Sequence, residues 1–193
     1  MEINQQRRQA VRTFVKSAKS ALARGVTIDS LNQVKQSLLE LCTQKHLFPR
    51  AEFPVPAPPQ TERTFLIHLD TDESHALYVN SGARGQNYRP HDHGESWAIV
   101  AAVSGRELHR LYQVEEDGQL HQTGSLTVEP GTAVSMLPGG IHSIHAESDE
   151  PLLHLHFYGL SMQRQSIRTE YDTKTGRAER CVAAGLDQIE DMR

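Results

Sequence analysis

The stretch Arg89–Trp97, RPHDHGESW, places two histidines one residue apart near the middle of the chain. Residues i and i+2 of a β-strand project from the same face, so His91 and His93 are predicted to point in one direction, where two imidazoles can share one ion. A pair with this spacing also arises by chance on exposed strands. The residues around the pair therefore decide between a metal site and two ordinary polar side chains.

The composition sets the class of protein before any further motif is considered. With 193 residues, 37% of them hydrophobic, the chain can bury one sizeable core and is expected to form one main domain. The formal net charge of -4 provides no basic excess for a nucleic acid or an acidic membrane surface, so neither is expected as a partner.

The chain also lacks the sequence signals of an exported or membrane protein. No apolar run reaches the ~20 residues of a membrane span, and the first residues lack the apolar core of a secretory signal. The two cysteines, Cys42 and Cys181, lie far apart and form no disulfide framework. A cytoplasmic location is therefore expected.

The first 48 residues are predicted to form a helical hairpin that packs on the rest of the chain. Apolar residues recur at helical spacing over 4–24, and a second stripe runs from Thr27, a capping residue, to about His46. Residues 49–60 hold five of the nine prolines and are predicted to be an extended connector.

From Thr61 to the end the pattern changes to short apolar segments separated by turn residues. No helical period is found there, and the spacing of the segments is typical of an antiparallel sandwich or barrel. The strands predicted from this pattern include 64–69, 97–103, 107–114, 132–137, 152–158 and 166–171.

Two glycine-containing motifs surround the histidine pair. Gly85 precedes His91 with five residues between them, an apolar run follows and ends at Gly105, and the turn 138–140 is followed closely by a third histidine, His142. This arrangement resembles the two metal motifs of the cupin superfamily. The resemblance covers residues 61–182, and it implies a double-stranded β-helix (jelly-roll) barrel, 61–193, with a metal ion at His91, His93 and His142.

The glutamate that many cupins supply as a fourth ligand is missing. Trp97 and Ala98 stand at the positions where that glutamate is expected, and Glu95 comes too early in the sequence. On a strand, however, Glu95 would lie on the same face as the histidine ligands. Three neutral nitrogen ligands leave positions open on the ion and retain its full charge for an anionic ligand such as a thiolate.

A third segment, 154–158, alternates polar and apolar residues. His154, His156 and Tyr158 are predicted to share the face toward the barrel interior, where buried polar groups need partners. The row is either part of the site or a hydrogen-bonded ladder in the core.

Taken together, these motifs resemble those of the cysteine dioxygenase family of thiol dioxygenases, in particular its bacterial cysteine and 3-mercaptopropionate dioxygenases. The likeness implies an Fe(II) enzyme that adds both atoms of O2 to a small thiol, acting as a monomer or weak homodimer. By the same likeness, His91, His93 and His142 hold the iron, Tyr158 points at the bound oxygen or the substrate carboxylate, and His156 orients Tyr158.

The chain departs from this family at two places. His154 stands where the family has serine, which changes the hydrogen-bond relay beside the catalytic pair. The cysteine that forms a thioether with the tyrosine in some members is replaced at about Ala98, so no Cys-Tyr crosslink is expected.

A carboxylate on the substrate requires a cation beside the metal, and a guanidinium matches both carboxylate oxygens. Two arginines resemble family residues with this role: Arg63 at the start of the first barrel strand and Arg168 in the C-terminal segment. A solvated surface role remains open for both.

The other histidines are expected at the surface or in packing, and they are His46, His68, His75, His109, His121 and His145.

Two further functions remain open at this level. One is a different metal-dependent cupin reaction, an oxygenation or an isomerisation, because one scaffold hosts many chemistries. The other is a cupin that binds a ligand without turnover, against which the polar row at 154–158 argues, since a polar interior is costly to satisfy.

Overall fold

The structure is a computed structural model that describes residues 2–116, 118–147, 150–165, 167–183 and 188–193. Two helices, α1 (Ile3–Leu22) and α2 (Ile28–Thr43), precede two β-sheets, with short 3-10 turns at Lys45–Leu47 and Met162–Arg164. The strands are β1 (Glu62–His68), β2 (Ser74–Gly82), β3 (Asn87–His91), β4 (Ala98–Ser104), β5 (Glu107–Val114), β6 (Leu120–Val128), β7 (Ala133–Met136), β8 (Ile141–Ala146), β9 (Leu152–Leu160), β10 (Arg168–Tyr171), β11 (Ala178–Cys181) and β12 (Glu190–Asp191).

Two facing sheets form the barrel. One has the strand order β12-β1-β2-β9-β4-β7 and the other the order β11-β10-β3-β8-β5-β6, and the pairings are antiparallel except for β1 with β12. From β2 to β9 the chain crosses repeatedly between the sheets, which produces the jelly roll of a double-stranded β-helix. The predicted fold class, a mostly β cupin barrel preceded by two helices, is confirmed.

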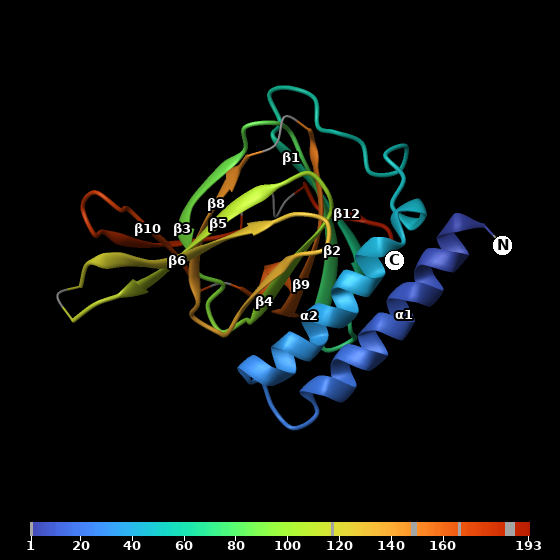
Figure 1. The fold of residues 1–193 in the computed structure, drawn as a ribbon, viewed down its shortest axis with the longest axis horizontal. Coiled ribbons are helices and arrows are strands. Elements are labelled where there is room, and N and C mark those ends of the chain that lie inside the picture. Colours follow the sequence, from blue (N-terminus) through green and yellow to red (C-terminus); the bar gives the residue numbers. More distant parts are fainter. Residues whose placement is uncertain (1, 117, 148–149, 166, 184–187) are drawn as a thin grey trace.

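The helices cover one face of the first sheet, as Figure 1 shows. On β9, Leu155 and Phe157 face outward into a core shared with the helices, where Phe14 of α1 meets Phe157 edge to face at 4.8 Å between ring centroids. Tyr158 faces the barrel interior together with a second group of apolar residues. Because both faces of this sheet are covered, β9 is buried along nearly its whole length.

The start of α2 follows from its sequence. Thr27 accepts a hydrogen bond from the backbone N–H of Ser30 at 3.1 Å, and the Ser30 hydroxyl accepts one from the backbone N–H of Thr27 at 2.8 Å. This reciprocal capping satisfies donors that the first turn leaves free, as the sequence predicts. Neither helix is long and apolar enough to cross a membrane, nor is any other in the described ranges.

Candidate metal centre

Three histidines, two from adjacent strands and one from the loop after β3, meet inside the barrel. His91 is the last residue of β3, His142 lies opposite it on β8, and His93 follows in the loop after β3. One nitrogen of each ring lies within 4.8 Å of the others, and all three side chains are buried. The structure thus brings the three predicted ligands together, although His93 reaches the site from a loop and not from a strand.

The loop that carries His93 is held by Asp92. Its carboxylate accepts hydrogen bonds from the backbone N–H groups of Gly94 and Thr169, both at 2.9 Å, and from the Tyr171 hydroxyl at 3.2 Å. Gly94 has a φ of 59°, and a Cβ there would lie 2.8 Å from Ile167. These contacts tie the histidine loop to β10, the strand that begins with Arg168.

The hydrogen bonds of the triad agree with a metal ligated through Nε2. His91 Nδ1 lies 2.8 Å from the carbonyl oxygen of Arg89, which only accepts, so this nitrogen carries the proton and Nε2 is free to ligate. His142 Nε2 is buried and has no hydrogen-bond partner among the described residues, whereas its Nδ1 lies 2.9 Å from His109 Nδ1. An orphaned buried nitrogen is the expected signature of a ligand atom.

The same three histidines are held neutral. Burial, followed by the charge of Arg168, lowers the pKa of His91 to about 3 and the pKa of His93 well below its usual range. Burial, followed by the neighbouring His91, does the same for His142. Neutral imidazole is the form that ligates metals, and three nitrogen donors leave positions open for a substrate. The residues therefore fit a divalent transition metal.

Glu95 is not part of this site. Its side chain is exposed and lies outside the group of three, so the missing cupin glutamate is not replaced from this position. Trp97 and Ala98 are buried, and the Trp97 ring packs on Phe157 at 5.1 Å between centroids. Trp97 and Ala98 therefore pack in the hydrophobic core and do not bind the metal.

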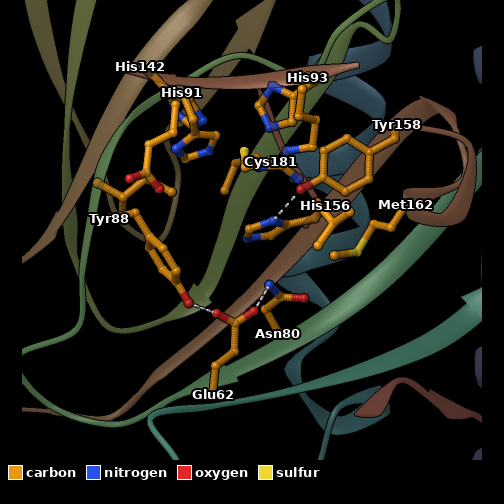
Figure 2. Close-up of a pocket in the computed structure, with 15 residues that line it drawn as sticks. Glu62, Asn80, Tyr88, His91, His93, His142, His156, Tyr158, Met162 and Cys181 are labelled. Carbon is orange, nitrogen blue, oxygen red and sulfur yellow. Dashed lines mark hydrogen bonds between the residues drawn. The ribbon is translucent and has the colours of Figure 1, made fainter. Parts of the chain in front are cut away.

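Next to the triad lies the pair His156 and Tyr158 on β9. His156 Nδ1 and the Tyr158 hydroxyl are 3.0 Å apart, and the Tyr158 ring lies 5.3 Å from the His93 ring (Figure 2). Burial lowers the pKa of His156 to about 3 and raises the pKa of Tyr158 above its usual value. At neutral pH, Tyr158 thus keeps its proton and His156 is uncharged.

The triad and this pair line a cavity of about 100 Å³. Drug-sized ligands occupy pockets of several hundred Å³, so this volume suits a small molecule. In Figure 2 the three histidines lie at one side of the cavity and Glu62 at the other, with Tyr158 and His156 between them.

Arg168 supplies a buried cation to the cavity. It is 8% exposed, it lines the cavity with the triad, and its Nη1 makes a long contact of 3.4 Å to Gln165 Oε1. Its Nε is buried and lacks a hydrogen-bond partner within the described ranges. A buried guanidinium with a spare donor is suited to an anionic group such as a carboxylate.

Arg63 points away from the cavity. It follows Glu62 on β1, so the alternation of the strand sends its side chain to the other face. There its Nε donates to Glu190 at 2.9 Å and its guanidinium lies over the Phe65 ring. The structure therefore brings Arg168, and not Arg63, to the predicted site.

Glu62 closes the side of the cavity opposite the metal triad. Its carboxylate accepts hydrogen bonds from Gln86 Nε2 at 2.6 Å, from the Asn80 amide and from the Tyr88 hydroxyl. Burial raises the pKa of Glu62 to about 7, since hydrogen bonds from neutral groups only partly offset the loss of water. No motif in the sequence points to Glu62.

A second buried glutamate lies behind the triad. Glu107 Oε2 is 3.2 Å from His109 Nε2 and 3.0 Å from His154 Nδ1. Burial alone would raise the pKa of Glu107, but the two histidines hold it well below its usual range. His154, predicted at the catalytic pair, is buried behind the cavity and contacts this carboxylate.

His109, expected at the surface or in packing, is fully buried and contacts His142. The alternation of the predicted strand 107–114 already puts Glu107 and His109 on one face, and this signal could have identified them. His145 instead lies partly exposed beside Asn87 and Arg110, outside the site.

Cys181 also lines the cavity, although it lies far from the histidine motifs in the sequence. Strand β11 pairs with β10 and places Cys181 opposite Arg168. Burial raises the pKa of the Cys181 thiol, which keeps it protonated. The absence of a Cys-Tyr crosslink stays a prediction.

Comparison with known proteins gives likenesses to solved structures only. No family model and no curated protein matches the chain. An oxalate oxidase in complex with the substrate analogue glycolate is 17% identical with a TM-score of 0.45, covering 59% of this chain and 59% of its own. A protein with a double-stranded beta-helix domain from Klebsiella pneumoniae is 15% identical with a TM-score of 0.45, covering 62% and 93%.

The cupin domain of Schizosaccharomyces pombe Cnp3 is 10% identical with a TM-score of 0.44, covering 54% of this chain and 64% of its own. Likenesses of this degree carry no functional argument. The fold rests on the strand order, and the candidate metal centre rests on its own geometry.

Proposed function

We propose that the protein is a non-haem Fe(II) thiol dioxygenase that converts a small thiol carboxylate, cysteine or 3-mercaptopropionate, to its sulfinic acid. One observation carries the proposal: a single small cavity combines three neutral imidazoles, the His156–Tyr158 pair and the buried Arg168. The imidazoles would hold the metal that binds the sulfur and O2, Arg168 would bind the carboxylate, and the His156–Tyr158 pair would donate a hydrogen bond at the reacting end.

The proposed reaction balances without a further reductant. The thiol R–SH and O2 give R–SO2H, so two S–O bonds form while the O–O bond breaks. Four electrons leave the sulfur and four enter O2, and the proton lost by the thiol returns with the acidic product. Bound Fe(II) supplies the redox chemistry that activates O2 beside the thiolate.

The substrate is oriented by Arg168. A carboxylate facing the spare Nε donor would satisfy a polar atom that is otherwise left buried and unpaired. The carboxylate charge would also neutralise a guanidinium that is 8% exposed. This pairing leaves the sulfur end of the same molecule directed toward the three histidines.

The pair His156 and Tyr158 holds a proton at the reacting end. When His156 Nδ1 carries a proton it donates to the phenolic oxygen, and the Tyr158 O–H then remains available to the substrate or to oxygen. The raised pKa of Tyr158 keeps this donor protonated across the physiological range. Its role is to stabilise negative charge as it develops.

The decisive experiment measures O2 consumption by Fe(II)-loaded protein with cysteine, 3-mercaptopropionate, cysteamine and mercaptosuccinate, and the mass of each product. We expect uptake with cysteine or 3-mercaptopropionate and a product heavier by two oxygen atoms. The His142→Ala variant is expected to lose iron and activity together. Iron-loaded protein that consumes no O2 with any thiol would refute the proposal, and stoichiometric zinc would favour another cupin reaction.

The two arginines provide a matched pair of variants. Arg168→Gln should raise KM for thiol carboxylates by about 10- to 100-fold, the equivalent of a lost charged hydrogen bond, while Arg63→Gln leaves KM unchanged. Cysteamine has no carboxylate and should respond to neither substitution. Equal effects of both substitutions would contradict the role given to Arg168.

A further inference from the structure

Three buried polar side chains continue from His142 of the metal triad: His109, Glu107 and His154. His142 Nδ1 lies 2.9 Å from His109 Nδ1, His109 Nε2 lies 3.2 Å from Glu107 Oε2, and the same oxygen lies 3.0 Å from His154 Nδ1. They come from β8, β5 and β9, in both sheets. We name His142, His109 and Glu107 the triad relay.

The relay is almost inaccessible to water. His109 is 0% exposed, His142 is 1% exposed and Glu107 is 6% exposed. A carboxylate and two imidazoles in such a place cost free energy unless their donors and acceptors match. The matching of donors with acceptors therefore determines where each proton sits.

Only one order of protons satisfies the relay when a metal is bound. A metal takes the lone pair of His142 Nε2, so the neutral ring carries its proton on Nδ1 and donates it to His109 Nδ1. His109 must then carry its own proton on Nε2, which faces the Glu107 carboxylate. The Glu107 carboxylate accepts this last hydrogen bond in its ionised form, so no proton has to move when the metal binds.

We propose that Glu107 and His109 are positioning residues that fix the tautomer and ring orientation of His142 and increase its donor strength toward the metal. The proposal rests on the metal site of the proposed function, but not on its thiol chemistry. Histidine ligands commonly donate their second nitrogen to a carboxylate, which strengthens them as ligands. Here a second histidine carries that effect from a carboxylate deeper in the barrel.

Glu107→Gln is the most direct test, because glutamine keeps the shape and can still accept from His109, but removes the charge. We expect the affinity for Co²⁺, measured by competition with a chromophoric chelator, to fall about tenfold or more. The visible absorption bands of bound Co²⁺ should shift, because the donor strength of His142 changes. A purely structural role would lower thermal stability and leave both readouts unchanged.

Substitutions at His109 provide an independent series. Glutamine can accept from His142 and donate to Glu107, whereas leucine can do neither. We therefore expect Co²⁺ affinity to decrease in the order wild type, His109→Gln, His109→Leu. This order can be measured even if Glu107→Gln does not fold.

A control separates the relay from nearby packing. His145→Gln changes a histidine on the same strand as His142 but outside the relay. It should keep Co²⁺ affinity within about twofold of wild type while the relay variants lose at least tenfold.

The outcomes distinguish this inference from the proposed function. Wild-type affinity and unchanged Co²⁺ bands in both Glu107→Gln and His109→Gln would overturn the relay. Co²⁺ binding that persists in His142→Ala would overturn the relay and the metal site together. A protein that behaves as expected with Co²⁺ but oxidises no thiol would leave the relay intact and refute only the thiol dioxygenase.

Discussion

At the scale of single residues, two buried glutamates differ in charge because their neighbours differ. Glu62 and Glu107 both lie within the barrel, yet burial raises the pKa of Glu62 to about 7 while two histidines hold that of Glu107 well below its usual range. Glu62 receives hydrogen bonds only from neutral groups, and Glu107 faces histidines that can donate or carry charge. The two carboxylates therefore have opposite consequences for stability.

The raised pKa of Glu62 predicts a pH-dependent stability for the metal-free protein. Between 4.5, the unperturbed pKa, and about 7, Glu62 in the folded state retains a proton that the unfolded chain has lost, so the contribution of Glu62 to the free energy of unfolding falls as pH rises. The buried neutral histidines contribute in the opposite direction, so the effect of Glu62 is read from the difference between the wild type and a variant. The loss is at most about 3 kcal/mol, and smaller because Glu62 is partly exposed to the cavity. Glu62→Gln should remove this loss, as measured by urea unfolding at pH 5 and pH 8.

A control for this prediction is Glu95→Gln, which makes the same change on an exposed side chain. We expect it to leave the difference in unfolding free energy between pH 5 and pH 8 as in the wild type. If Glu62→Gln shows the same difference as the wild type, Glu62 does not titrate in this range.

At the scale of elements, one arginine fastens the proline-rich connector to the barrel. Arg50 Nη1 donates to the Ser81 hydroxyl and the Leu152 carbonyl, both at 3.0 Å, and Nη2 donates to the Pro151 carbonyl at 2.6 Å. The connector therefore joins the ends of strands that are distant in sequence. Nothing in residues 49–60 alone indicates this contact.

Replacing Arg50 by methionine should lower the free energy of unfolding by about 2 kcal/mol or more, because partly buried carbonyl groups lose a charged donor. Arg63→Met is the matched control: it breaks an ion pair with a half-exposed partner, which contributes about 1 kcal/mol or less. Both changes in the free energy of unfolding are measured by denaturant titration, provided that the slope of free energy against denaturant concentration is the same as in the wild type. Equal losses in the two variants would show that Arg50 holds the connector no more firmly than a surface pair.

At the scale of the whole molecule, the metal centre joins the two motifs of the barrel. His91 and His93 come from the β3 end and His142 from β8, so an ion bound by all three links segments about fifty residues apart. A ligand that binds only the folded state stabilises it. Metal binding should therefore be visible in thermal unfolding.

Co²⁺ at about a hundred times its Kd should raise the free energy of unfolding by about 2.7 kcal/mol, or the melting temperature by roughly 5–10 °C for a chain of this size. The measurement is thermal unfolding followed by circular dichroism, with and without Co²⁺. His142→Ala should show no such shift. An equal shift in that variant would mean that the ion binds elsewhere.

The alternation and spacing of residues were sufficient to predict several parts of the molecule. The resemblance of the histidine and glycine motifs to those of cupins implied the barrel and the convergence of His91, His93 and His142, and the structure brings these three side chains together. Local capping chemistry likewise predicted the start of α2 at Thr27. The alternation of the strand placed His156 and Tyr158 on one face, and the family resemblance implied that they pair, as they do at 3.0 Å.

By itself, then, the sequence determined two helices followed by a β-rich region and the shared face of alternating polar residues, since these depend on spacing along the chain. The resemblance of its motifs to those of cupins pointed to the barrel and to the candidate ligands. Only the tertiary structure decided that Arg168 enters the cavity while Arg63 faces outward, and that His109 and Glu107 stand behind His142. These contacts depend on strand register and on which sheet face is covered. Both are set by packing between segments distant in sequence, and no local pattern carries that information.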